Sequence, residues 1–128
     1  MILLLDTSTP QCRLTFIEGE WRYDATWEAG RGLAKGLLAF LETELISQGK
    51  TWQDVTGLVA YQGPGSFTGL RIGITVFNTL AYANAWPIVG ATGDDWQQTG
   101  VARLEAGEND EIVLPEYGGE ANITKPKK

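Results

Sequence analysis

Hydrophobic and polar positions alternate in the first quarter of the chain. Residues 2–5 form a short apolar run that ends at Asp6, a pattern typical of a strand covered on both faces. Every second position is apolar in residues 12–16 and again in residues 21–27, with a turn signal at residues 18–20 between them. The pattern therefore predicts three consecutive strands in meander order.

The middle of the chain changes to the spacing of helices. Apolar residues recur every three or four positions from Leu33 to Ile46, which predicts an amphipathic helix that stops near Gly49. Residues 57–61 have the composition of a buried strand, and residues 68–85 are long enough for a second helix.

Three further elements complete the predicted order. Residues 87–92, PIVGAT, are expected to form a strand, residues 94–106 a helix with Asp94 or Asp95 as its N-cap, and residues 111–114 a last short strand. The order β-β-β-α-β-α-β-α predicts a mixed sheet with helices packed on it. This α/β layout is that of a single ribonuclease H-like or actin-like lobe.

The second predicted helix is apolar on every side. Residues 70–85 carry one charged side chain, Arg71. A helix that is apolar all round has to be buried all round, and a sheet covers one face of it. We therefore predict that a partner protein covers the rest, because large exposed apolar patches are uncommon on monomers. The alternative is that the first helix and the C-terminal helix cover it completely.

A glycine-rich loop, GPGSFTG at residues 63–69, joins the strand at 57–61 to this helix. Such a loop can present main-chain N–H groups to a phosphate at the start of a helix. It lacks the lysine of a P-loop, however, and Thr68 stands where the dinucleotide motif needs glycine. The alternatives are a structural turn and a contact loop for a ligand or partner, with Ser66 or Thr68 capping the helix.

The amino-acid composition excludes several classes of catalytic and metal site. The chain has no histidine and one cysteine, Cys12, which the strand pattern places in the core. Histidine-dependent nucleophiles and zinc motifs are therefore excluded. The net charge of −6 argues against binding of nucleic acid without a partner, because such binding depends mainly on Lys and Arg. The one basic cluster in the sequence is TKPKK at residues 124–128. No apolar run is long enough to span a membrane and the start does not look like a secretory signal, so we expect a cytoplasmic protein.

One continuous stretch of the sequence is more specific for a protein family than the spacing of its glycines alone. GPGSFTGLRIG, residues 63–73, resembles the signature of the bacterial TsaB family, also called YeaZ, the non-catalytic partner in threonylcarbamoyladenosine (t6A) modification of tRNA. The opening LLLDTSTPQCRLTF, residues 3–16, is similar to the first hairpin of that family, and PIVGAT to its strand after the signature helix. The resemblance extends over residues 2–92 and implies an actin-like ATPase fold.

The resemblance also implies a function. It indicates an accessory subunit, not an enzyme, that forms a heterodimer with a TsaD-like ATPase and permits transfer of the threonylcarbamoyl group to adenosine 37 of tRNA. The catalytic relative binds its metal through a His-x-x-x-His pair, which a chain without histidine does not have. A TsaE-like ATPase is a further candidate partner, a homodimer through the same helices is an alternative assembly, and tRNA is expected only through the complex.

Two sets of candidate site residues follow, with no catalytic or metal-binding residue among them. The predicted partner contacts are Leu37, Leu41, Leu45, Phe67, Leu70, Ile74, Phe77 and Tyr82, with Gly69 and Gly73 allowing close helix approach. The candidate phosphate contacts are Asp6, Thr7, Gly63, Pro64, Gly65, Ser66, Thr68 and Arg71. Because a nucleotide in this fold lies between two lobes, we expect ATP or ADP with magnesium only at the partner interface.

The rival hypothesis is a small actin-like hydrolase or peptidase that binds nucleotide by itself and uses Asp6 as a metal ligand.

Two departures from the family also bear on function. Family members usually carry a second lobe, whereas here a short stretch follows Ala91 and ends in a Pro-x-Tyr segment like the family's last one; we expect a naturally short form, with one lobe at 1–118 and a tail at 119–128. The family's His-Ser-Glu start to the first helix is replaced by GRGLAKG, residues 30–36.

Overall fold

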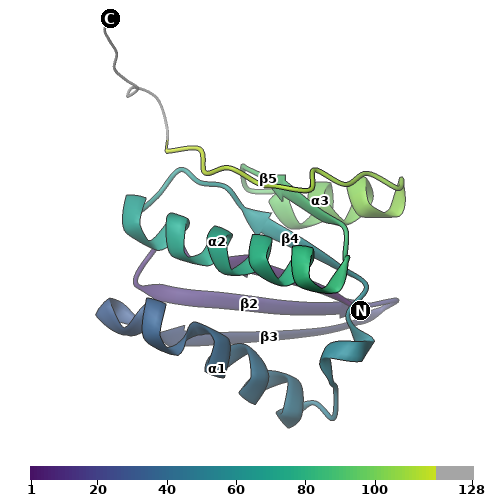
Figure 1. Ribbon diagram of the computed structural model, residues 1–128, viewed down its shortest axis with the longest axis horizontal. Coiled ribbons are helices and arrows are strands. Elements are labelled where there is room, and N and C mark those ends of the chain that lie inside the picture. The colour runs from purple at the N-terminus through teal and green to yellow at the C-terminus, as the bar shows by residue number, and fades with distance from the viewer. Residues whose placement is uncertain (118–128) are drawn as a thin grey trace, which may run out of the picture.

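A five-stranded mixed sheet carries helices on both of its faces in the computed structural model, which describes residues 1–117 (Figure 1). The predicted order β-β-β-α-β-α-β-α is confirmed. The strands are β1 (Ile2–Asp6), β2 (Gln11–Glu18), β3 (Trp21–Glu28), β4 (Gly57–Tyr61) and β5 (Ile88–Ala91). The helices are α1 (Leu33–Ser47), α2 (Phe67–Asn84) and α3 (Trp96–Glu105), with 3₁₀ turns η1 (Gly30–Gly32) and η2 (Trp52–Asp54). The predicted tail at 119–128, with its basic cluster, lies outside the described residues.

The sheet has the order β3-β2-β1-β4-β5. The meander predicted from the alternating pattern is present, because β1 pairs antiparallel with β2 and β2 antiparallel with β3. Gly19 takes a positive φ of 60° in the tight turn between β2 and β3. The strands that follow helices, β4 and β5, pair parallel to β1 and to each other.

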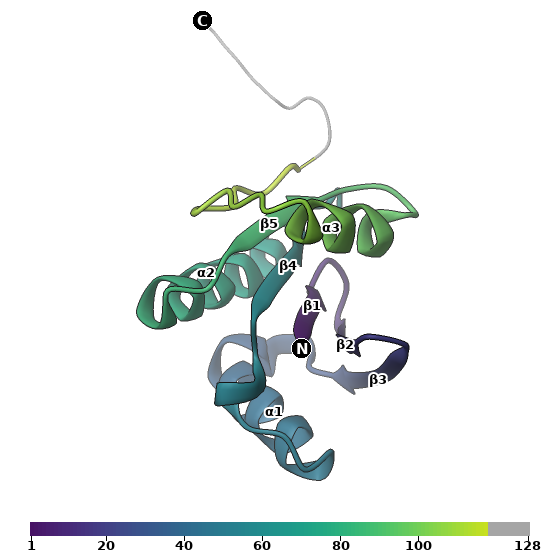
Figure 2. The ribbon, with the colours of Figure 1, turned by 90° about the vertical axis from the view of Figure 1, so that its right-hand side faces the viewer.

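Helices α1 and α2 lie side by side on one face of the sheet, and α3 lies on the other (Figure 2). Between the helix pair and the sheet lies the larger core, in which Leu3, Phe16 and Leu58 of the strands are fully buried. The core beneath α3 is smaller and is centred on Leu4 and Val59. None of the described helices is long and apolar enough to cross a membrane.

The segment after α3 is a strap and not the strand predicted at 111–114. Residues 109–117, which we call the C-terminal strap, run along the free edge of β5. The side chains of Asn109 and Asp110 accept hydrogen bonds from the backbone N–H groups of Ile88 and Gly90, at 3.0 and 2.9 Å. Because these side chains already satisfy the edge donors of β5, the strap forms no ladder with it. Val113 is buried against α2 instead.

Candidate functional site

The glycine-rich loop and the start of α2 pack against the turn between β1 and β2. A Cβ atom on Gly65 would overlap Ser8, and one on Gly69 would overlap the carbonyl oxygen of Thr7. A Cβ on Gly73 would overlap the side chain of Thr7. Glycines spaced by four residues therefore form a smooth stripe on the loop and helix, and the turn at residues 7–8 lies directly on it.

Hydrogen bonds hold these two segments together. The Thr7 hydroxyl donates to the carbonyl oxygen of Gly69 at 2.7 Å, and the Ser66 N–H donates to the carbonyl oxygen of Ser8 at 2.8 Å. Ser66, one of the two predicted caps, is the N-cap of α2, since its hydroxyl accepts the Gly69 N–H at 3.2 Å. The loop thus uses the N–H groups of Ser66 and Gly69 for hydrogen bonds within the chain itself.

The candidate phosphate contacts do not form one open cradle. The N–H of Ser8 donates to Asp6 Oδ1 at 2.8 Å, so this donor is engaged, as are those of Ser66 and Gly69. Gly63, at φ 118°, is covered by the strap, where an added Cβ would overlap the carbonyl oxygen of Glu116. The remaining candidates lie on the surface of the loop and helix: Pro64, Thr68 and Arg71. Three of the donors that could face a phosphate are thus engaged within the chain, and Gly63 is covered by the strap.

The predicted partner contacts divide sharply by burial. The structure places six of them in the core of the monomer, where a partner does not reach them: Leu37, Leu41, Leu45, Leu70, Ile74 and Phe77. Gly69 and Gly73 allow close approach, but to Thr7 of the same chain. Phe67 and Tyr82 are accessible, at 55% and 90% exposure.

The chain itself covers much of α2, the helix that we predicted a partner protein would cover beyond the sheet. The sheet covers one side of it and α1 a second, while Val113 of the strap adds a further contact. The alternative fails in one part, because α3 lies on the opposite face of the sheet. The side that remains open is less apolar than the composition suggested, since it includes Thr75 and Thr79.

An outward-facing surface nevertheless exists between the two helices. A hollow of about 440 Å³ lies between the starts of α1 and α2, with Ala34 on one wall and Ile72 and Val76 on the other. Leu38, one helical turn beyond Ala34, is 48% exposed. We call this the α1–α2 face; its residues are Ala34, Leu38, Thr68, Arg71, Ile72, Thr75, Val76 and Tyr82.

Sequence reasoning missed most of this face. Leu38 follows Leu37 directly, yet its side chain points about 100° away around the helix, toward solvent. The apolar spacing predicted α1, but it placed Leu38 and Ile46 in the stripe that faces the core, although both are exposed. The signal that was available is an apolar side chain just outside the stripe, which an isolated soluble helix does not need.

Phe67 anchors a small exposed cluster at one end of the face. Its ring lies 4.5 Å from the ring of Tyr117, measured between centroids, and the guanidinium of Arg71 lies 5.3 Å from its centroid. Arg71 thus makes a cation–π contact with the loop. The strap therefore ends beside the start of α2.

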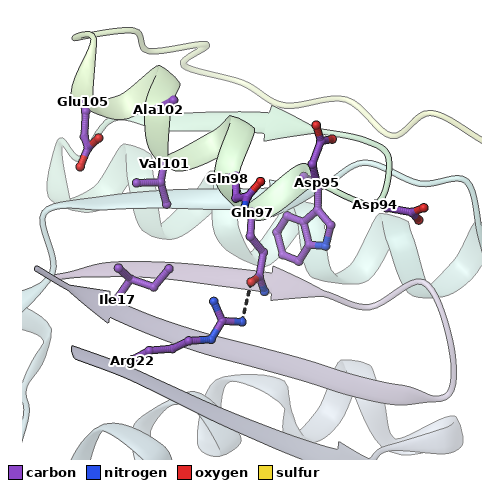
Figure 3. A pocket seen from close by; sticks show the side chains of 10 residues that line it. Ile17, Arg22, Asp94, Asp95, Gln97, Gln98, Val101, Ala102 and Glu105 are labelled. Atoms are coloured by element: carbon purple, nitrogen blue, oxygen red, sulfur yellow. Dashed lines mark hydrogen bonds between the residues drawn. The ribbon is translucent and has the colours of Figure 1, made fainter. Parts of the chain in front are cut away.

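A second hollow, of about 690 Å³, lies between α3 and strands β2 and β3 (Figure 3). Figure 3 shows Arg22 and Gln97 bridging it, and the guanidinium of Arg22 donates to Gln97 Oε1 at 2.6 Å. Arg22 also donates to Asp24, and this interaction holds the pKa of the Asp24 carboxyl below its usual range. The hydrogen bond between Arg22 and Gln97 joins residues 75 positions apart, so no local sequence pattern could predict it.

The single thiol of the chain, Cys12, is buried. Burial raises the pKa of the Cys12 thiol to about 12, so the thiol stays protonated at neutral pH. Among residues 1–117, no group of three histidine, cysteine, aspartate or glutamate side chains is arranged to hold a metal ion. Asp6, proposed as a metal ligand under the rival hypothesis, accepts the backbone N–H of Ser8.

Comparison with protein families gives one match over half of the chain. Residues 28–92 match the family model described as "TsaD: tRNA N6-adenosine threonylcarbamoyltransferase". Among curated proteins, the chain is 28% identical to the tRNA threonylcarbamoyladenosine biosynthesis protein TsaB of Escherichia coli K12, over 94% of the chain and 56% of that protein. It is 31% identical to TsaB of Haemophilus influenzae, over 69% of the chain and 37% of that protein.

Solved structures agree with these relatives. YeaZ from Pseudomonas aeruginosa superposes with a TM-score of 0.68 at 29% identity, over 83% of the chain and 49% of that structure. A second structure, of an uncharacterized protein with similarity to peptidase YEAZ from the same organism, gives a TM-score of 0.67 at 31% identity, over 71% of the chain and 42% of that structure. The chain spans about half the length of the relatives it matches, or less.

Proposed function

Because the chain belongs to the TsaB (YeaZ) family, we propose that it takes part in the biosynthesis of threonylcarbamoyladenosine in tRNA as a non-catalytic subunit. In this role it binds a TsaD-type protein, which transfers the threonylcarbamoyl group. tRNA is contacted through that complex, since a chain with a net charge of −6 has little attraction for a phosphate backbone.

The observation that carries this proposal is the α1–α2 face. Ala34 of α1 and Ile72 and Val76 of α2 line a hollow, and Leu38 is exposed one helical turn beyond Ala34. No charged residue follows Arg71 in α2. A surface of this kind suits docking of helices from another protein, in which apolar side chains fill the groove between two helices. An ordinary interface of about 600–1,000 Å² per partner would cover it.

The non-catalytic part of the proposal rests on the available side chains. Histidine is absent from the sequence, and the thiol of Cys12 is buried and protonated. A histidine base or a cysteine nucleophile for acyl transfer would therefore have to come from the partner.

For ATP or ADP with magnesium, we propose binding only at the interface with the partner. Three N–H groups of the candidate phosphate loops, those of Ser8, Ser66 and Gly69, already donate within the chain. Titration of the isolated chain with Mg-ATP in a calorimeter should give no heat of binding. Micromolar binding or turnover by the chain alone would favour the rival hydrolase instead.

The heterodimer is tested by mixing the chain with the TsaD-type protein of the same genome and measuring the dissociation constant. Leu38→Glu should weaken the complex at least tenfold, because it brings an unpaired charge into the apolar contact. Ile74→Glu is unsuitable, since Ile74 is 4% exposed and its replacement would disrupt the monomer.

The matched control is Ile46→Glu, the same replacement of an exposed apolar residue near the far end of α1. It should leave the dissociation constant within about twofold. Equal weakening by both variants would remove the assigned surface, and no complex with the unmodified chain would overturn the proposed function. Light scattering at several concentrations shows whether the chain uses the same face in a homodimer.

A further inference from the structure

Three cations lie near the starts of the two helices that form the α1–α2 face. Helices α1 and α2 begin at the same end of the molecule (Figure 1). Arg31 lies in η1 immediately before α1, Lys35 in the first turn of α1, and Arg71 in the second turn of α2. Arg71 and Ala34 both line the hollow of this face. In the chain, Ala34 lies between Arg31 and Lys35.

These cations have no ion-pair partner within residues 1–117, whereas Arg22, Lys50 and Arg103 each pair with a carboxylate there. The carboxylate of Glu28, close to Arg31 in the chain, accepts a hydrogen bond from Gln11 instead. All three cations are exposed.

Their position is unfavourable for the isolated helices. A helix N-terminus carries a partial positive charge and is stabilised by acidic residues. Neither α1 nor α2 has an acidic residue in its first turn, and α1 has Lys35 there. Two helix starts and three exposed cations therefore add positive charge beside a hollow that Ala34, Ile72 and Val76 help to line.

We propose that the docking surface of the partner carries carboxylates opposite Arg31, Lys35 and Arg71, and apolar side chains opposite Leu38, Ile72 and Val76. This inference rests on the proposed function and adds the chemistry of the partner to it. A protein fits better than a nucleic acid, because three of the six residues that line the hollow are apolar, namely Ala34, Ile72 and Val76. The charged end fixes the orientation of docking and accelerates encounter, and the apolar part supplies the contact.

The test measures association rates with the TsaD-type protein at about 50 mM and about 300 mM salt. The triple variant Arg31→Glu, Lys35→Glu, Arg71→Glu should associate about tenfold or more slowly at low salt, and the dependence of the rate on salt should shrink or reverse. The single variant Lys35→Glu should show a smaller decrease in the same direction. Its matched control is Arg13→Glu, which changes the net charge equally on the α3 side of the sheet; its rate should stay within about twofold.

Thermal melting separates binding from folding. Glutamate near a helix start interacts favourably with the helix dipole, so Lys35→Glu should melt no lower than the unmodified chain while it binds more slowly. A complex that forms at the same rate with the triple variant would overturn the inference and leave the proposed function standing. Absence of any complex would overturn both. Binding of RNA by the isolated chain, lost in the triple variant, would also overturn the inference, because the cations would then serve a nucleic acid.

Discussion

The two faces of the sheet hold their helices by different kinds of contact. On one face, α1 and α2 pack through a large apolar core and through the close approach of Gly69 and Gly73 to Thr7. On the other, α3 covers a small apolar cluster and is tied by polar side chains, Gln97 at its start and Arg103 near its end.

This difference indicates on which face of the sheet the fold tolerates amino-acid substitutions. Apolar packing depends on shape, so removing or adding atoms beneath α1 and α2 cannot be compensated by water. Partly exposed polar contacts beside α3 exchange for bonds to water at little cost. We therefore expect large effects of substitution on the first face and small, pH-dependent effects on the second.

The largest effect is expected for Phe77→Ala, which removes a fully buried ring from α2. The lost contacts and the resulting cavity should lower the free energy of unfolding by about 3–5 kcal/mol. Tyr82→Ala, on the open side of the same helix, should change it by less than about 0.5 kcal/mol. Urea denaturation of both variants measures the contrast, and similar losses would mean that α2 is not oriented as described.

An intermediate effect is expected from the glycine stripe. Gly69→Ala and Gly73→Ala should each cost about 1–3 kcal/mol, because each new methyl group overlaps Thr7. The obstacle differs between them: it is the carbonyl oxygen of Thr7 for Gly69 and the side chain of Thr7 for Gly73.

A double-mutant cycle with Thr7→Ala exploits this difference. Shortening Thr7 should recover about 0.5–3 kcal/mol of the loss in Gly73→Ala. It should recover little in Gly69→Ala, where the backbone is the obstacle. Equal recovery in both cycles would show that the helix moves away from the turn as a unit.

The elements of the fold follow from the sequence because each depends on neighbours in the chain. Alternation in residues 21–27 predicts β3, and the leucine spacing after Leu33 predicts α1, as the structure confirms. The resemblance of residues 63–73 also led to the family that the comparisons support.

The exposed surface and the contacts of the glycines could not be predicted from the sequence, for two physical reasons. A helix such as α2 that is apolar all round gives no signal of which side faces the sheet, so Ile74 and Tyr82 looked alike although one is buried and the other exposed. The glycines pack against Thr7, more than sixty residues earlier in the chain, and a local pattern cannot identify such a contact. The sequence could show that close approach was needed, but not which segment approaches.

The smallest effect, and the sharpest contrast between the two faces, is expected for Asp110 beside α3. Its hydrogen bond with Arg103 holds the pKa of its carboxyl below the usual range, and the N–H of Gly90 adds to this effect. The carboxylate therefore stabilises the fold above its ordinary pKa of about 3.9, and this contribution is lost as the pH falls through the lower folded value.

Asp110→Asn should accordingly lower the free energy of unfolding by about 1 kcal/mol at neutral pH, a value reduced by solvent screening. The deficit relative to the unmodified chain should stay constant above about pH 5 and shrink below about pH 4, where the unmodified carboxyl becomes protonated. Asp94→Asn is the control, since Asp94 forms no ion pair within residues 1–117. Urea denaturation at several pH values measures both variants. A deficit that persists at low pH would mean that Asp110 acts through the shape of its contact with β5, as the buried residues of the other face do, and not through its charge.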